Sequence, residues 1–139
     1  MALMPKRVKY RKMQKGKCRG ISTRGDSLNF GEYGLKALDN GRVRANHIEA
    51  CRVTLVRKLR GAGKMWINVF PSKPVTKKPA ETRMGKGKGD LDHWVVVVKR
   101  GRVLFEVSGV PEDFAKSLLR LIAFKLPVRT KFISRHRGQ

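Results

Sequence analysis

Residues Lys73–Trp94 read KPVTKKPAETRMGKGKGDLDHW, and the two apolar runs beside this stretch set the frame of the fold. KMWINVF precedes it at residues 64–70 and HWVVVVK overlaps its end at residues 93–99; both have the β-branched and aromatic composition of strands. The glycines of GKGKG leave the backbone free to approach another surface closely. A connection longer than about 12–15 residues in a compact domain is usually functional or disordered. We therefore predict a long basic loop, residues 71–92, held between two strands.

The charge of the whole chain points to a polyanionic partner. The 139 residues contain 33 Lys plus Arg against 10 Asp plus Glu, a formal charge of +23, and the length suits one domain over residues 1–139. An excess of one sign throughout the chain favours nucleic acid, with a membrane surface as the weaker rival. The sequence has no apolar run long enough for a membrane span and no apolar signal segment, so we expect a cytosolic protein.

Residues with catalytic or metal-binding chemistry are sparse. Cys18 and Cys51 lack the spacing of a zinc ribbon, and we expect two reduced thiols. His47, His93 and His136 also lack zinc-ligand spacing. GKGKG has neither the hydroxyl residue nor the following helix of a phosphate-binding P-loop. We predict no enzyme activity, no cofactor, no metal and no small-molecule substrate.

Both ends of the chain are basic. Residues 1–25 contain no acid and few large apolar side chains, so this segment should be poorly ordered in water. We interpret it as an arm that orders against phosphates, in preference to a solubilising tail. Residues 135–139 form a short basic tail.

Short β segments and turns are expected at residues 27–43, including Leu28–Phe30 and a tight turn with positive φ at Asn40-Gly41. Strands are predicted at 64–70, 94–99, 103–107 and 128–134. The runs at 94–99 and 103–107 are expected to pair as a hairpin, and Trp66 and Trp94 to pack in or near the core.

Two helices are predicted. Residues 45–60 carry one apolar stripe, with Asn46 as a candidate cap and Gly61 in the terminating segment; the stripe comprises Ile48, Cys51, Leu55 and Leu59. Residues 111–126 begin at Pro111 and end before Pro127. The expected apolar stripe of this second helix comprises Phe114, Leu118, Leu121 and Ile122.

A small α+β body of two helices on a mostly antiparallel sheet, with basic extensions, fits a partner larger than the protein. A folded RNA offers phosphates and splayed bases to such extensions. Binding through Lys and Arg should weaken steeply with salt.

Several segments, taken in order, carry a resemblance that runs nearly from end to end. They are Pro5–Met13, Gly34–Ala37, Ile48–Ala50, Trp66–Pro71, Lys73–Pro79, Arg83–Gly89, Gly109–Glu112 and Leu126–Phe132. In these segments the chain resembles the bacterial type of the L-sixteen family of large-subunit ribosomal proteins.

The resemblance implies an α/β-hammerhead fold and a place in the ribosome, binding large-subunit (23S-type) rRNA near the peptidyl-transferase centre. It further implies neighbouring large-subunit proteins as partners, contact with A-site tRNA and, as a further candidate, P-site tRNA, and a role in late subunit assembly. A cytoplasmic ribosome is expected, with an organellar one as the alternative. The arginine matching Arg83 is hydroxylated in some bacteria. Where the family has a hydroxyl helix cap, this chain has Arg44.

On this hypothesis the tRNA-facing loop comprises Arg83, Met84, Gly85, Lys86, Gly87, Lys88 and Gly89. The rRNA-binding residues are Lys6, Arg7, Lys9, Arg11, Lys12, Lys15, Arg19, Arg52, Arg57, Arg60, Lys73, Lys77, Lys78, Arg129 and Lys131. Two other classes stay open at this point. A DNA-compacting protein would share the charge, and an enzyme acting on nucleic acid would need a metal or a general base.

Overall fold

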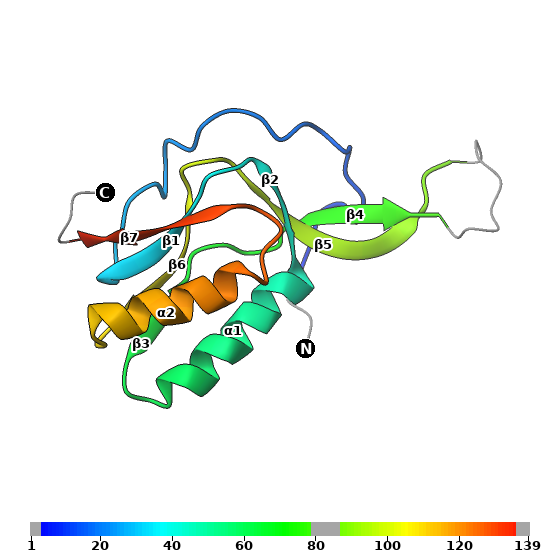
Figure 1. Ribbon diagram of the computed structural model, residues 1–139. Coiled ribbons are helices and arrows are strands. Elements are labelled where there is room, and N and C mark those ends of the chain that lie inside the picture. The colour runs from blue at the N-terminus through cyan, green and yellow to red at the C-terminus, as the bar shows by residue number, and fades with distance from the viewer. Residues whose placement is uncertain (1–3, 79–86, 136–139) are drawn as a thin grey trace.

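The computed structural model describes residues 4–78 and 87–135, which form two helices and two antiparallel sheets (Figure 1). The elements are β1 (Tyr33–Ala37), β2 (Gly41–Arg44), α1 (Ala45–Leu59), β3 (Lys64–Ile67), β4 (Lys73–Lys77), β5 (Asp90–Val98), β6 (Val103–Ser108), α2 (Glu112–Ala123) and β7 (Thr130–Ser134). The larger sheet has the order β3-β6-β1-β7 and the smaller one β2-β5-β4. The predicted α+β class is confirmed.

Helix α1 ends one residue earlier than predicted and buries the predicted stripe, Ile48, Cys51, Leu55 and Leu59. Its first turn is held by His47 and not by Asn46, because the Nδ1 atom of His47 accepts a hydrogen bond from the backbone N–H of Arg44 at 3.3 Å. At the other end Arg60 adopts a left-handed conformation with φ of 50°. Such a conformation is costly for a residue with a Cβ atom, and glycine usually supplies it.

Helix α2 is shorter than predicted, and the face that it buries differs in part from the predicted apolar stripe. It stops at Ala123, ahead of Pro127, and Pro111 precedes it as the N-cap residue. Its buried residues are Ala115, Leu118, Leu119 and Ile122, the i, i+3, i+4, i+7 set of one helix face. The prediction of Phe114 and Leu121 as core residues was wrong, because each retains 40% exposure at the edge of that face.

The predicted hairpin between residues 94–99 and 103–107 was also wrong. β5 and β6 follow one another in the chain but lie in different sheets. The connection at Gly101, where φ is 98°, pairs with the end of β1 instead. The N–H of Gly101 donates to the carbonyl of Ala37 at 2.7 Å, and the N–H of Ala37 donates to the carbonyl of Arg102 at 2.8 Å. These bonds turn the chain from one sheet into the other.

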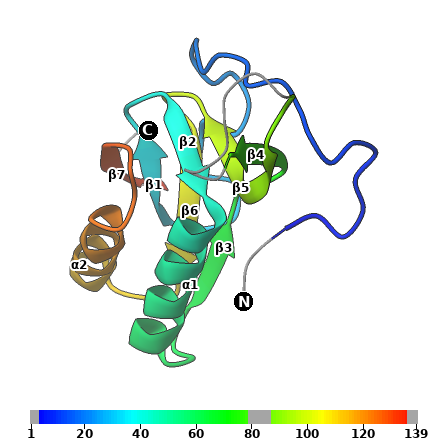
Figure 2. The same cartoon turned by 90° about the vertical axis from the view of Figure 1, so that its right-hand side faces the viewer.

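The predicted loop at residues 71–92 contains strand at both ends. β4 pairs with β5 from Lys73 opposite Val95 to Lys77 opposite Asp90, with an irregularity between Val75 and Thr76. β4 is an edge strand, and this position tolerates a proline such as Pro74. The two strands form a ribbon that projects away from the helices (Figures 1 and 2).

Two further strand predictions were too long. β3 stops at Ile67, although the backbone N–H of the next residue, Asn68, still donates to the carbonyl of Leu104 at 3.0 Å. β7 begins at Thr130 and not at residue 128. Residues 28–30 form no strand, and the backbone N–H groups of Asn29 and Phe30 donate to a buried carboxylate described below.

Residues 38–40 connect β1 to β2 in place of the predicted tight turn, and Gly41 lies in β2 without the predicted positive φ. A Cβ atom at Gly41 would lie 2.7 Å from the Cγ1 atom of Val128, so close packing explains the glycine. The side-chain oxygen of Asn40 accepts a hydrogen bond from the backbone N–H of Arg100 at 2.7 Å.

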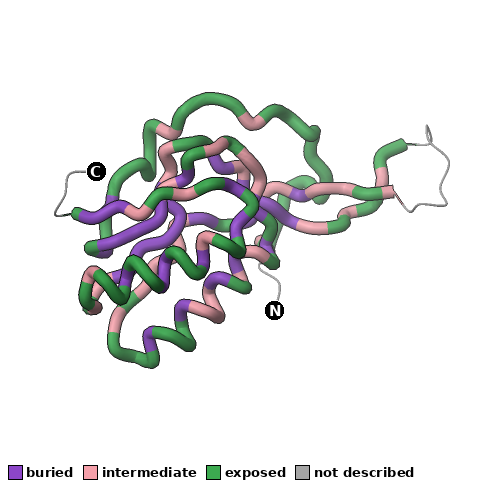
Figure 3. Tube along the Cα trace, viewed as in Figure 1, coloured by how far each residue is buried: buried purple, intermediate pink, exposed green. Residues whose placement is uncertain are grey.

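The core lies between the helices and the sheets, where buried positions concentrate (Figure 3). Its largest fully buried side chains include Phe105, Ile48, Leu55, Leu104, Leu119 and Ile122. Each such side chain stabilises the fold by about 1.5–3 kcal/mol relative to exposure. Trp94 is buried as predicted, and Trp66 is half-buried and stacks on Phe30 with ring centroids 6.1 Å apart.

Candidate nucleic-acid interface

The basic arm, described from residue 4 to residue 25, lies along the smaller sheet (Figure 1). Residues 4–32 contain no helix and no strand. Cationic side chains of the body hold it by its backbone carbonyls. Arg42 Nη2 donates to the carbonyl of Lys15 at 3.0 Å and lies 3.3 Å from that of Gly16. Lys73 Nζ also donates to the carbonyl of Lys15, and Lys88 Nζ donates to that of Met13. The arm is therefore attached to the ribbon of β4 and β5.

The second half of the arm is attached at the point where β5 leaves its sheet. The Cys18 sulfur lies 3.2 Å from the carbonyl oxygen of Val98, at the end of β5. Further along, Ser22 donates its N–H to the carbonyl of Arg100 at 2.9 Å, and Gly25 accepts from Val103 at 2.8 Å. These contacts fix the path of a segment whose composition alone predicts disorder.

The attachment leaves the cations of the arm itself in solvent. Its predicted RNA-binding residues are all exposed: Lys6, Arg7, Lys9, Arg11, Lys12, Lys15 and Arg19. A hollow of about 590 Å³ lies between the arm and the start of β5. Its lining residues are Lys9, Tyr10, Arg11, Lys12, Asp90 and Leu91. Exposed cations of the arm thus lie beside the start of β5 at this hollow.

The tip of the ribbon falls largely outside the described residues, and Arg83, Met84, Gly85 and Lys86 lie there. Gly87, with φ of 83°, Lys88 and Gly89 lead back toward β5. Lys77, at the end of β4, is exposed, whereas the next residue, Lys78, is half-buried. The structure therefore places the base of the predicted tRNA-facing loop beside the arm.

Five other predicted RNA-binding residues lie elsewhere, Arg52, Arg57 and Arg60 on or beside α1, and Arg129 and Lys131 at β7. Two of these already have carboxylate partners. Arg52 pairs with Glu49 at 2.5 Å, and this hydrogen bond lowers the pKa of Glu49. Arg129 pairs with Asp39 at 2.7 and 2.9 Å, and its side-chain and backbone hydrogen bonds lower the pKa of Asp39 to about 2.

Sequence reasoning missed Arg42, which fastens the arm. The alternation of β2 could have identified it, since Arg42 and Arg44 occupy the opposite face from buried Val43. The sequence also gave no indication of Glu106, a carboxylate with 0% exposure in the middle of β6.

Glu106 organises the loop before β1. Its Oε1 atom accepts hydrogen bonds of 3.0 Å from the backbone N–H groups of Asn29, Phe30 and Gly31. Its Oε2 atom accepts a bond from the side-chain amide of Asn68. Burial raises the pKa of Glu106, but these hydrogen bonds outweigh it, so the pKa lies below its ordinary value. The buried charge is therefore fully hydrogen-bonded and holds Asn29 and Phe30 in place.

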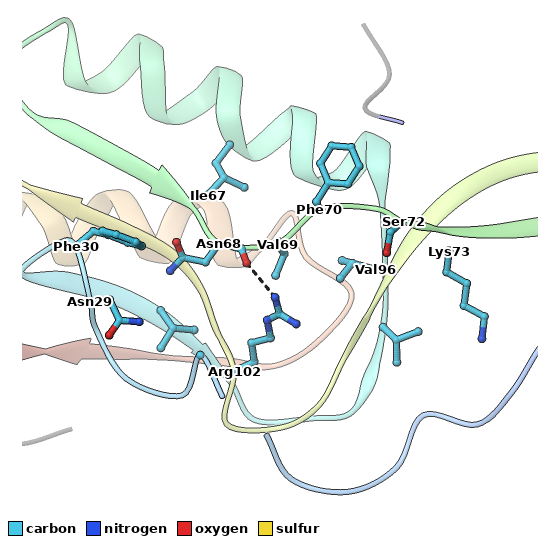
Figure 4. A pocket seen from close by; sticks show the side chains of 13 residues that line it. Asn29, Phe30, Ile67, Asn68, Val69, Phe70, Ser72, Lys73, Val96 and Arg102 are labelled. Atoms are coloured by element: carbon cyan, nitrogen blue, oxygen red, sulfur yellow. Dashed lines mark hydrogen bonds between the residues drawn. The ribbon is translucent and has the colours of Figure 1, made fainter. Parts of the chain in front are cut away.

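A cleft of about 890 Å³ opens beside this loop, between the two sheets (Figure 4). Phe30 and Asn29 lie at one end and Lys73 at the other. Arg102 lies between them and donates from its Nη2 atom to the carbonyl of Asn68 at 3.0 Å.

Among residues 4–78 and 87–135, no group of three or more His, Cys, Asp or Glu side chains is arranged to hold a metal ion. None of the described helices is both long and apolar enough to cross a membrane.

A family model for ribosomal protein L16p/L10e matches residues 5–133, nearly the whole chain. The chain belongs to the ribosomal protein L16p/L10e family. It is also similar to a large ribosomal subunit protein uL16 from Protochlamydia amoebophila, with 56% identity over 135 residues that cover 97% of each chain. The L16p/L10e match includes the arm, the ribbon and both helices, so the basic surface lies within the region that the family shares.

Proposed function

We propose that this chain, a structural constituent of the large ribosomal subunit, binds large-subunit rRNA with its arm and presents the ribbon tip to tRNA. Its partners are then rRNA, neighbouring ribosomal proteins and A-site tRNA, with P-site tRNA as a further contact. The proposal also includes a cytoplasmic ribosome, a role in late subunit assembly and no catalytic activity.

The observation that carries the rRNA proposal is the way in which the arm is attached. Arg42, Lys73 and Lys88 bind backbone carbonyls of the arm, so the attachment uses none of the arm's own charges. Those charges remain exposed along a surface that also includes Lys77. A row of Lys and Arg of this kind binds phosphates and positions a protein without reading base sequence.

The tRNA proposal is supported by the shape of the ribbon. Two paired strands extend the segment around Lys88 away from the body, which lets it reach a molecule beyond the rRNA surface (Figure 1). Arg83 stays a predicted tRNA contact and a predicted hydroxylation site outside the described residues.

A strained backbone supports the assignment of Arg60 to RNA. It is the one non-glycine residue with positive φ among the described residues, and its side chain is exposed. Strained residues cluster at functional sites.

The test separates attachment to the subunit from translation. Replacing the three tip cations with alanine should leave the protein in the large subunit and lower translation per subunit; the replaced residues are Arg83, Lys86 and Lys88. The arm loses its contact with Lys88 but keeps its own cations and its contacts with Arg42 and Lys73. Replacing the arm cations should release the protein in a moderate salt wash; these residues are Lys6, Arg7, Lys9, Arg11 and Lys12. Sedimentation followed by mass spectrometry measures occupancy, and the same peptides show whether Arg83 carries an added oxygen.

Alanine at Arg120 and Lys116 is the matched control, because both lie exposed on α2, away from the ribbon. It should change neither quantity. Loss of the tip variant from the subunit, with normal translation in the subunits that keep it, would refute the tRNA assignment. Migration of the unchanged protein outside the subunit would refute the whole proposal.

A further inference from the structure

We infer that the cleft between the two sheets holds one unstacked RNA base, with Phe30 as its stacking surface. The inference rests on the proposed function, since it assumes that the protein lies against RNA, and it adds a defined subsite to that interface. It concerns a part of the molecule other than the arm and the ribbon tip.

The aromatic surface comes first. Phe30 is 61% exposed although it is a large apolar side chain. Trp66 stacks against it with 20° between the ring planes, so one ring face is supported from within and the remaining surface stays open. Bases stack on aromatic faces of this kind regardless of their identity.

The backbone that carries Phe30 is fixed by hydrogen bonds and close packing, so the ring offers a defined stacking surface. Backbone N–H groups on either side of the Phe30 side chain, those of Phe30 itself and Gly31, bind the Glu106 carboxylate at 3.0 Å. A Cβ atom at Gly31 would lie 2.8 Å from the carbonyl oxygen of Val107, so the loop is packed directly on β6. The fold already holds this ring in place, so a base that stacks here binds without further loss of side-chain entropy at Phe30.

The polar groups around the ring match the rest of a nucleotide. The Asn29 side-chain amide is exposed, makes no hydrogen bond with a described residue, and can both donate to and accept from a base edge. Arg102 uses one nitrogen on the carbonyl of Asn68, and its other donors border the cleft. Lys73 lies at the far end of the cleft (Figure 4). Its ammonium donates one hydrogen bond to the carbonyl of Lys15 and has further donors for a phosphate that follows the base.

Apolar side chains form the floor of the cleft, where a base needs shielding from water. Val69 and Val103 are nearly fully buried and line the cleft, so a base would be shielded from water on the side that faces the core. The cleft volume of about 890 Å³ lies within the range of about 300–1,000 Å³ that is usual for ligand sites. RNA readily provides such an occupant, because bulged and loop nucleotides can be splayed out of their helices.

The test places a photoreactive benzoylphenylalanine at Phe30 and, as the matched control, at Phe124, which is 79% exposed after α2. Each variant is incorporated into large subunits in cells, and the subunits are purified and irradiated. Reverse transcription should then stop at one rRNA nucleotide for position 30 and not at that nucleotide for position 124. Subunits containing Phe30→Leu should remain fully occupied, since the arm is intact. In them the Watson–Crick edge of the same nucleotide should become roughly tenfold more reactive to a methylating reagent, the size of one lost stack.

A cross-link from position 30 to a neighbouring protein, or none in occupied subunits, would overturn the inference and leave the proposed function standing. An unchanged base reactivity in F30L subunits would also overturn it. Failure of the unaltered protein to enter the subunit would instead refute the proposed function, so the two failures are distinguishable.

Discussion

Replacing the buried carboxylate of Glu106 tests how the loop before β1 is held. Glu106→Gln keeps the size of the side chain and one carbonyl oxygen, but removes the charge. Three backbone N–H groups and one side-chain amide lose a charged acceptor. The side chain has 0% exposure, so water cannot replace it.

The magnitude follows from the number of bonds. A hydrogen bond to a charged group contributes about 1.5–3 kcal/mol and a neutral one about 0.5–1.5 kcal/mol, so each of three backbone bonds weakens by roughly 1 kcal/mol. The relief of a buried charge offsets part of this loss. We expect Glu106→Gln to lower the free energy of unfolding by about 2–3 kcal/mol. Glu106→Ala should cost more, because it leaves several buried N–H groups without acceptors.

The acid dependence gives a second readout. The folded-state pKa of Glu106 lies below its ordinary value of 4.5, so its stabilisation is complete above that pH and is lost as the pH falls through the folded value. The unaltered protein should therefore lose stability below about pH 4.5. The Glu106→Gln protein should lose less over the same range, because its side chain does not titrate.

Urea unfolding followed by tryptophan fluorescence, at pH 7 and at several values below 4.5, measures both effects. Asp26→Asn is the matched control, since it removes one exposed negative charge near the same loop. Equal stabilities of the Glu106→Gln and unaltered proteins at pH 7, with parallel acid profiles, would refute the anchoring role.

Three further predictions follow from single positions. Arg60→Gly should raise the free energy of unfolding by about 0.5–1 kcal/mol in a urea titration, because glycine adopts positive φ without strain. The same substitution should weaken RNA binding in a filter assay. Unchanged binding would argue against an RNA contact at Arg60. Cys51 is buried, and burial raises its pKa to about 11. Iodoacetamide at pH 8 should therefore label the partly exposed Cys18 well before Cys51, which peptide mass spectrometry measures. Equal labelling of the two cysteines would mean that the core opens readily. Gly34→Ala would place a Cβ atom 2.7 Å from the backbone oxygen of Phe105, so we expect a melting temperature several degrees lower, and an unchanged one would show that β1 and β6 can separate.

The sequence predicted those elements whose signal is local. The α1 stripe repeats at helical spacing, and its buried residues follow that spacing. The register of α2 was harder, because Phe114 and Leu121 are apolar but Ala115 and Leu119 fill the buried face. Apolar character alone does not fix which side of a short helix meets a sheet.

Pairing between distant segments was not readable. The residues from Trp94 to Val107 have the pattern of a hairpin, yet the connection bonds to Ala37 and the strands separate into two sheets. The predicted interface shows the same difference between local features and contacts of distant segments. The cations were evident from composition, whereas the carbonyl contacts that place the arm depend on Arg42, which becomes informative only when the arm is beside it.

An arm fastened through its main chain can change its side chains without losing its attachment. Any residue at position 13 or 15 offers the same carbonyl to Lys88 or Lys73, so substitution there alters what the arm presents and not where it runs. A substitution at Arg42 has the opposite effect, because it weakens the attachment of an arm whose own residues are unchanged. For attachment alone, substitution should therefore be tolerated along the arm and not at the few body positions that hold it, so any constraint on the arm's side chains comes from the RNA that they meet.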